Sequence, residues 1–341
     1  MKLLHRASTI AIAQCAANTG APPAASCSCP LARPPPHTTT PPPPLPNATL
    51  SPTTRSLLLV ATACVAAAAP RELSPSHFSG KRILVVSAHP DDNEFFFGGT
   101  LAAINALPEP AEAVGYAIFT NGDKGCFNAS LCSDATTTEQ IAAMRAEETV
   151  AAAAALGVKA ENVFLLHYND GELGWAQNRD LETSLIAVVR QFKPHVAVTW
   201  ERYPVLELAP GDWGDAGFHP DHQVSARVTL AVCAGPGAGN KFMAPGVGGA
   251  PWQTTELYFA RFGVAAATAD VFVPIPEECV QAKLRATSYH YSQALGNVTG
   301  APAVQLRQGM KATAGNATAA AQTKSMYAYV EAFATYGAAW E

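Results

Sequence analysis

The sequence predicts an α/β fold built on one Rossmann-like, doubly wound and mainly parallel sheet. Three observations support it. From about residue 81, short β-branched apolar runs alternate with helix-length segments, which is typical of βαβ units. Clusters of polar residues follow the ends of two expected strands, where such sheets bind ligands. The 261 residues of 81–341 are also a suitable length for one large domain.

The first 80 residues predict a disordered leader. They contain 14 of the 27 prolines and one acidic residue, and they show no hydrophobic periodicity. Such a segment cannot bury enough apolar surface to offset the entropy of ordering. We therefore expect a leader at 1–80 and a single catalytic domain at 81–341.

The expected strands are short apolar runs in chain order. The first is β-branched enough to be a buried parallel strand, and later runs repeat the pattern. These runs are 82–88, 114–120, 162–168, 195–200 and 256–261.

Helix-length segments separate these strands. The first is expected from GGTL at residue 98, and the second is Ala-rich and ends before Gly157. Gly- and Pro-rich sequence at 235–251 predicts a surface loop. The helices after the first are expected at 137–156, 180–192 and 223–233.

Charge and hydropathy exclude two classes of protein. The region after the leader carries 17 basic and 26 acidic residues without a Lys/Arg cluster, so no nucleic-acid partner is expected. No run reaches the roughly 20 apolar residues of a spanning helix, which excludes a polytopic membrane protein.

The apolar segment 56–69 has the residue pattern of a secretory signal: a basic residue before it, a short apolar core and small residues at a plausible cleavage point. It follows about fifty Pro-rich residues, however. It is a displaced signal, a membrane anchor or part of a two-part organelle address. Sequons at Asn47, Asn128, Asn297 and Asn316 favour the secretory pathway. We expect the endoplasmic reticulum membrane or secretory pathway, with secretion or organelle targeting as alternatives.

The cysteines add a second indication of compartment. Cys126 and Cys132 bracket a short loop that could close a disulfide in an oxidising compartment. Cys233 lies in an apolar helical stretch, where a buried free thiol is expected.

Two clusters contain the ligand-type residues, AHPDDNE at 88–94 and FHPDHQ at 218–223. A catalytic zinc site uses three protein ligands and keeps one position open. His89, Asp92 and His222 form such a set. Asp91 and His219 are then available as a carboxylate base and an oxyanion donor, the groups that amide hydrolysis also requires. The structural alternative is two polar turns.

The motifs resemble the PIG-L/LmbE-type zinc-dependent N-deacetylases, which remove acetyl groups from N-acetylglucosamine (GlcNAc) conjugates. The resemblance covers about 82–293. Its motifs are AHPDD-x-E with GGTL, TNGDKG at 120–125, R-x-x-E at 145–148 with LGV at 156–158, NDGEL at 169–173, HPDH at 219–222, and K-x-x-A-x-x-x-H-x-S-Q at 283–293, which ends in H-x-S-Q.

The resemblance implies the same roles for the five residues above: zinc ligands at His89, Asp92 and His222, a general base at Asp91, and intermediate stabilisation or amine protonation by His219. Arg145 and Asp170 match positions that contact substrate in relatives; the alternatives are a helix-surface ion pair and a turn aspartate. Asp221 could orient a ligand histidine or cap a helix starting near Gln223. His290 and Gln293 could support the site or serve packing.

The resemblance also implies a substrate and a cofactor. The first expectation is GlcNAc-phosphatidylinositol, in glycolipid-anchor synthesis, with membrane association through 56–69. The alternatives are a secreted or lumenal deacetylase of soluble GlcNAc sugars and, in another class, a sugar-binding protein without turnover. Zinc is the expected ion, and a His2Asp set also accepts other first-row divalent metals.

Overall fold

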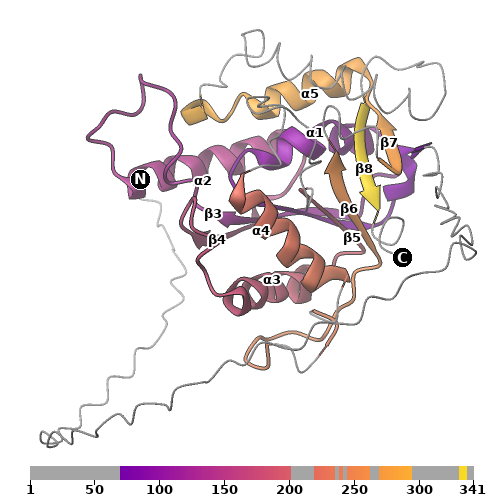
Figure 1. Cartoon of the computed structure of the whole chain (residues 1–341). Helices are drawn as coiled ribbons and strands as arrows, with labels where there is room; N and C mark the ends of the chain where they lie inside the picture. Colours follow the sequence, from indigo (N-terminus) through magenta and orange to yellow (C-terminus); the bar gives the residue numbers. More distant parts are fainter. Residues whose placement is uncertain are drawn as a thin grey trace, which may run out of the picture. The chain divides into compact units, whose positions relative to one another are not determined.

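The computed structural model describes residues 70–200, 219–234, 238–240, 244–261, 269–293 and 330–335. Within this part, eight strands form one sheet in the order β1-β7-β8-β6-β5-β2-β3-β4 (Figure 1). All pairings are parallel except those of β8, which is antiparallel to both neighbours. The strands are β1 (Arg71–Glu72), β2 (Arg82–Ser87), β3 (Ala113–Thr120), β4 (Val163–Tyr168), β5 (Val196–Thr199), β6 (Glu256–Arg261), β7 (Val271–Pro274) and β8 (Val330–Thr335). The predicted mainly parallel α/β fold is confirmed.

Helices cover both faces of the sheet. In Figure 1, α1, α2 and α5 lie on one face, and α3 and α4 lie on the other. Because β2 is covered on both sides, its residues 83–86 are all fully buried. The helices are α1 (Asp92–Asn105), α2 (Thr138–Ala155), α3 (Asn178–Phe192), α4 (Pro220–Thr229) and α5 (Glu277–Thr287).

Two helices begin at least three residues earlier than the sequence predicts. Helix α1 starts at Asp92 and not at residue 98, because the HPDD turn itself initiates the helix. Helix α4 starts at Pro220, with His219 as its N-cap, and not near Gln223. Proline suits the first helical turn, where its missing N–H costs nothing. The acidic clusters therefore lie at helix N-termini.

The folded part extends further toward the N-terminus than the predicted boundary at residue 80. Leu73 is 4% exposed and Phe78 is 1% exposed, and both belong to the core. Strand β1 also pairs with β7. Residues 70–80 were assigned to the leader because of their composition, but these two apolar side chains anchor them.

The C-terminal strand joins the sheet centrally. β8 lies between β6 and β7, and its Glu331 is buried against α1. Neither β7, α5 nor β8 is predicted from the sequence. Among the described residues no helix is both long and apolar enough to cross a membrane. The apolar segment 56–69 and the sequons at Asn47, Asn297 and Asn316 lie outside that part of the chain.

Candidate metal centre and active site

The two predicted polar clusters meet at the carboxyl end of β2. β3 flanks β2 on one side and β5 on the other, so the order of strands reverses at this point. Side chains at such a switch point face a crevice beyond the strand ends. The turn after β2 contributes His89, Asp91 and Asp92, and the start of α4 contributes His219 and His222.

Three of these side chains converge most closely. His89 Nδ1 lies 3.0 Å from His222 Nε2, and His222 Nε2 lies 3.2 Å from Asp92 Oδ1. His89 Nδ1 also lies 3.6 Å from Asp92 Oδ2. The Trp200 indole stacks on the His222 ring at 4.2 Å between centroids, which fixes the plane of that ring. The structure therefore brings together the predicted His2Asp set.

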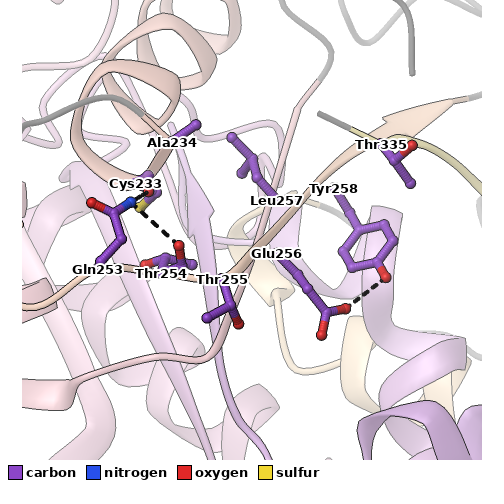
Figure 2. Close-up of a pocket in the computed structure, with 9 residues that line it drawn as sticks. All are labelled: Cys233, Ala234, Gln253, Thr254, Thr255, Glu256, Leu257, Tyr258 and Thr335. Carbon is purple, nitrogen blue, oxygen red and sulfur yellow. Dashed lines mark hydrogen bonds between the residues drawn. The ribbon is translucent and has the colours of Figure 1, made fainter. Parts of the chain in front are cut away.

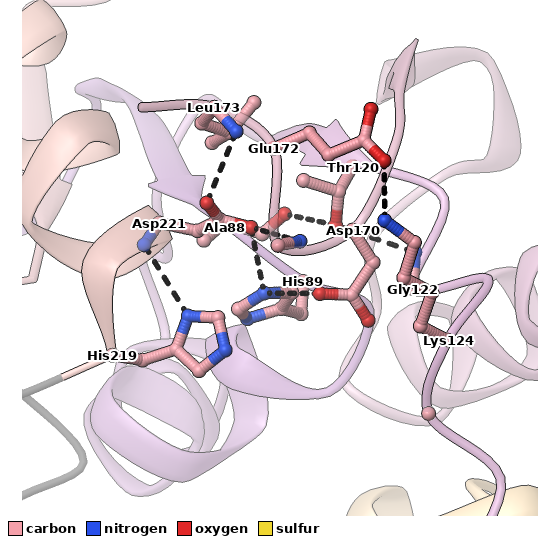
Figure 3. A network of polar contacts seen from close by, with 12 residues as sticks. Ala88, His89, Thr120, Gly122, Lys124, Asp170, Glu172, Leu173, His219 and Asp221 are labelled. Atoms are coloured by element: carbon pink, nitrogen blue, oxygen red, sulfur yellow. Dashed lines mark hydrogen bonds and ion pairs between the residues drawn. The ribbon is translucent and has the colours of Figure 1, made fainter. Parts of the chain in front are cut away.

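The other nitrogen of His89 faces two carboxylates. Nε2 lies 3.1 Å from Asp170 Oδ1 and 3.4 Å from Asp221 Oδ2 (Figure 3). A proton on Nε2 is stabilised by these carboxylates, so the lone pair of Nδ1 is directed toward His222 and Asp92.

Asp221 also connects two segments of the site. Its carboxylate accepts hydrogen bonds from the backbone N–H groups of Gly171 at 2.7 Å and Leu173 at 3.1 Å. The predicted alternative, that Asp221 caps its own helix, is wrong because His219 is the N-cap. Through these two hydrogen bonds, Asp221 instead connects the loop after β4 to α4.

The cluster is strongly anionic and buried. Burial opposes ionisation of Asp92, but His222 and His89 outweigh it and hold the pKa of Asp92 well below its usual value. Burial likewise disfavours charge on His89, but Asp170, Asp221 and Asp92 raise its pKa well above the usual value. The site therefore strongly favours a positive charge among these side chains.

This arrangement suits a bound divalent metal ion. Ligand atoms around a tetrahedral zinc with bonds of 2.0–2.1 Å are separated by about 3.3 Å. His222 Nε2 lies 3.0 Å from His89 Nδ1 and 3.2 Å from Asp92 Oδ1, close to that separation. Nitrogen and carboxylate donors match zinc and other first-row metals. Further sets with donor atoms within 4.8 Å of one another share His89; they are His89, His219 and His222, and His89, Asp170 and Asp221.

Asp91 has an unusual backbone. Its φ of 109° lies in the left-handed region, and its side chain makes no capping hydrogen bond to α1. Burial raises its pKa, against the opposing effect of Arg145. Strained residues of this kind cluster at functional sites.

Arg145 lies beside Asp91 and is 3% exposed. Its Nη2 lies 3.3 Å from Asp91 Oδ1 and donates to the carbonyl of Pro90. Its Nη1 donates to the carbonyl of Gly122 at 3.1 Å. The alternative of a helix-surface ion pair is wrong, and the predicted contact of Arg145 with substrate stays a prediction.

His219 is the exposed histidine of the site. Its Nδ1 accepts a hydrogen bond from the Asp221 N–H at 3.3 Å (Figure 3), and its ring centroid lies 4.5 Å from that of His89. Burial, followed by the charges of His89 and His222, lowers the pKa of His219. The neutral ring therefore carries its hydrogen on Nε2.

Sequence reasoning gave no role to Glu148 or Ser292. Both are buried, and the Glu148 carboxylate accepts from Ser292 N at 2.7 Å and Ser292 Oγ at 2.6 Å. His290 is also buried, with Nε2 3.1 Å from Glu94 Oε2. The R-x-x-E and H-x-S-Q motifs contained these residues, but only the fold shows that they pair.

A hollow lies away from this site, at the amino ends of the strands. It encloses about 280 Å³ at the amino end of β6, lined by Cys233, Glu256 and Tyr258 among others (Figure 2). Burial raises the pKa of the Cys233 thiol to about 12, so it stays protonated. The Glu256 carboxylate is already bonded to Lys81, His77 and Tyr258. This hollow offers no reactive group comparable to the His/Asp cluster.

The fold and the site define a Rossmann-like α/β protein with a His/Asp cluster at its switch point. Residues 84–233 match the model of the PIG-L family, described as GlcNAc-PI de-N-acetylase. The predicted resemblance is confirmed.

A curated relative is the 1D-myo-inositol 2-acetamido-2-deoxy-alpha-D-glucopyranoside deacetylase of Rhodococcus jostii (strain RHA1). It is 30% identical over 198 residues, which cover 53% of this chain and 61% of the relative. The chain thus spans about three-fifths of the length of this relative.

Two solved structures share the fold. N,N'-diacetylchitobiose deacetylase from Pyrococcus horikoshii matches with a TM-score of 0.60 and 20% identity, covering 77% of this chain and 86% of that one. GalB, the 4-carboxy-2-hydroxymuconate hydratase from Pseudomonas putida KT2440, matches with a TM-score of 0.51 and 18% identity, covering 75% and 96%. Because a deacetylase and a hydratase share this fold, the activity has to be argued from the site.

Proposed function

We propose that this protein is a metal-dependent hydrolase that removes the N-acetyl group from a GlcNAc conjugate. The observation that carries the proposal is the convergence of His89, Asp92 and His222, with separations of 3.0 to 3.6 Å, beside the strained Asp91. The family match over 84–233 supports it.

Each side chain has a role in this proposal. His89, Asp92 and His222 would hold zinc or another first-row ion, which when bound polarises the amide oxygen and acidifies water. Asp91 accepts the proton of the attacking water. His219 directs its Nε2–H toward the oxyanion or protonates the departing amine. Asp170 and Asp221 hold His89 in the required tautomer.

The substrate we propose is GlcNAc attached to inositol. The family is described as acting on GlcNAc-phosphatidylinositol, and the curated relative is named for a GlcNAc-inositol compound, so this core is common to both. The phosphatidyl group is the finer proposal. Arg145 and Asp170 are the proposed substrate contacts, the latter at sugar hydroxyls.

The alternative is a secreted or lumenal deacetylase of soluble GlcNAc sugars. The Cys126–Cys132 disulfide in the structure favours an oxidising compartment, which supports this alternative and a location in the secretory pathway. A glycolipid deacetylase with its domain on the cytosolic face would not carry a glycan at Asn128. A sugar-binding protein without turnover is the remaining candidate.

The test is acetate release by the purified full chain, with and without chelator, on three substrates: GlcNAc-inositol, GlcNAc-phosphatidylinositol and soluble GlcNAc oligomers. We expect chelator-sensitive release from the inositol conjugates. Release from the glycolipid alone would support the anchor-synthesis role, and release from the oligomers alone would support the soluble-sugar alternative. No release from any substrate by metal-loaded protein would contradict the enzymatic proposal.

A further inference from the structure

We infer that Glu148, a buried carboxylate of α2, positions Asp91 through a connected series of contacts. The series runs from Glu148 to the turn at 291–293, then to the loop at 122–128, and through Arg145 to Asp91. The inference rests on the proposed role of Asp91 as the base. It assigns a function to a residue 6% exposed that contacts none of the proposed metal ligands in the described part of the chain.

The last contact in the series holds Asp91 itself. A φ of 109° at a non-glycine residue is strained and persists only when the surroundings enforce it. Arg145 supplies this restraint, because its Nη2 donates to the Pro90 carbonyl and lies 3.3 Å from Asp91 Oδ1. The guanidinium therefore fixes both the peptide before Asp91 and the carboxylate.

The loop after β3 holds the guanidinium from the other side. A Cβ at Gly122, whose φ is 61°, would collide with Arg145, and a Cβ at Gly125 would lie 2.9 Å from Nη1. These glycines let the backbone approach closely enough for the Gly122 carbonyl to accept from Nη1 at 3.1 Å. The position of this loop therefore determines the position of Arg145.

The turn at 291–293 determines the position of the loop. Gln293 Nε2 donates to the Gly125 carbonyl at 2.7 Å. The Ser292 carbonyl accepts from Phe127 N at 2.8 Å and Asn128 N at 3.1 Å. The Asn128 side chain also donates to the Tyr291 carbonyl at 2.9 Å. Four hydrogen bonds thus connect the turn to the loop, on both sides of Cys126.

Glu148 completes the series. Its carboxylate accepts from both the backbone N–H and the hydroxyl of Ser292, which is fully buried. Glu148 lies three residues after Arg145 on α2, so the two side chains share one helix face. One face of α2 therefore carries both Glu148, where the series begins, and Arg145, its last link before Asp91. Loss of the Glu148 contacts would release the loop that confines Arg145.

A double-mutant cycle between Glu148 and Asp91 tests the inference. We expect Glu148→Ala to lower kcat about 10-fold or more, because misplacement of a reacting group is costly, with KM and metal content unchanged. In an Asp91→Asn background we expect Glu148→Ala to lower the residual kcat no further. A merely structural role would lower kcat by the same factor in both backgrounds.

Two further variants complete the design. Ser292→Ala removes one of the two hydrogen bonds to Glu148 and should show a smaller fall in kcat with the same non-additivity; it decides the question if Glu148→Ala does not fold. Glu256→Gln is the matched control, because this carboxylate also accepts several hydrogen bonds, from His77, Lys81 and Tyr258, but lies at the amino ends of the strands, opposite the site. It should leave kcat unchanged in both backgrounds.

The outcomes separate the inference from the proposed function. If Asp91→Asn alone leaves kcat unchanged, both the base assignment and the inference fail. If Asp91→Asn lowers kcat but Glu148→Ala has no effect, or its full effect persists in the Asp91→Asn background, the inference alone is overturned.

Discussion

Asp91 shows at the scale of one residue how stability and function oppose each other. Its left-handed backbone and its buried carboxylate, whose pKa burial raises, both destabilise the folded state. The distances that define the His2Asp set do not involve it. A residue of this kind is explained by the proton transfer we propose for it.

We therefore predict that Asp91→Ala abolishes acetate release, by about 10²-fold or more, while metal stays bound. Its melting temperature should change little, because removal of the buried carboxylate also leaves the buried Arg145 guanidinium without that partner. Acetate release, metal content and thermal unfolding measure the three effects. Asp134→Ala, at an exposed aspartate, is the control. Retained turnover in Asp91→Ala would exclude Asp91 as the base.

At the scale of elements, a buried ion pair joins α1, α5 and β8. Lys283 Nζ donates to Glu331 Oε1 and to the Phe95 carbonyl, each at 2.6 Å. Glu331 also accepts from Gly99 N at 2.9 Å. In a regular α-helix the Phe95 carbonyl accepts a hydrogen bond from the Gly99 N–H. The ion pair contacts both of these groups, so it inserts into the hydrogen-bond ladder of α1. A Cβ at Gly99 would lie 2.9 Å from Glu331 Oε1, which explains the second glycine of the GGTL motif.

We predict that Lys283→Met and Glu331→Gln each lower the free energy of unfolding by about 3–5 kcal/mol, because each leaves a buried group without its partner. The double variant should lose clearly less than the sum of the two, as measured by urea unfolding. The exposed Lys124–Glu172 pair is the control, and its disruption should change stability by less than about 1 kcal/mol. Additive losses would show that the two buried charges are not coupled.

At the scale of the whole molecule, the two edges of the sheet carry separate charge clusters. The carboxyl edge holds the His/Asp site, and the amino edge holds Glu256 with Lys81, His77 and Tyr258. Burial opposes ionisation of Glu256, but Lys81, His77 and Tyr258 outweigh it and lower its pKa. A lowered pKa gives stability that is present above the unfolded pKa and is lost as the pH falls through the folded pKa.

We predict that Glu256→Gln is less stable than the unmodified protein at pH 7 and that this difference narrows as the pH falls from about 5 to about 3. Urea unfolding at several pH values measures it, and the comparison with the unmodified protein removes the contribution of the site carboxylates. Acetate release at pH 7 should not change. A difference that stayed constant with pH would mean that ionisation of Glu256 does not stabilise the fold.

Local patterns predicted much of the fold. The buried run in β2 and the Ala-rich segment of α2 are set by neighbouring residues, so the sequence placed these elements within one or two positions. The start of α1 was missed because the HPDD turn was interpreted only as a ligand cluster. β8 was missed because its partners, β6 and β7, are far from it in sequence.

The site, like the fold, could be predicted from the sequence only in part. His89, Asp92 and His222 were selected from residue type and from the rule that parallel strands end at one edge, and the structure brings them together. That rule places side chains near a crevice, but it does not say which carboxylate faces which nitrogen. The contacts of Asp170 and Asp221 with His89 Nε2 needed the fold.

By itself the sequence determined the fold class, a candidate ligand set and the resemblance to the PIG-L family, because strand and helix periods and short motifs are set by neighbouring residues. Only the tertiary structure decided that Arg145 is buried beside Asp91, that Glu148 accepts hydrogen bonds from Ser292 and that β8 lies between β6 and β7. The physical reason is distance along the chain. Such contacts join segments tens to hundreds of residues apart, and their partners are selected by packing and by satisfaction of buried polar groups, which no local pattern records.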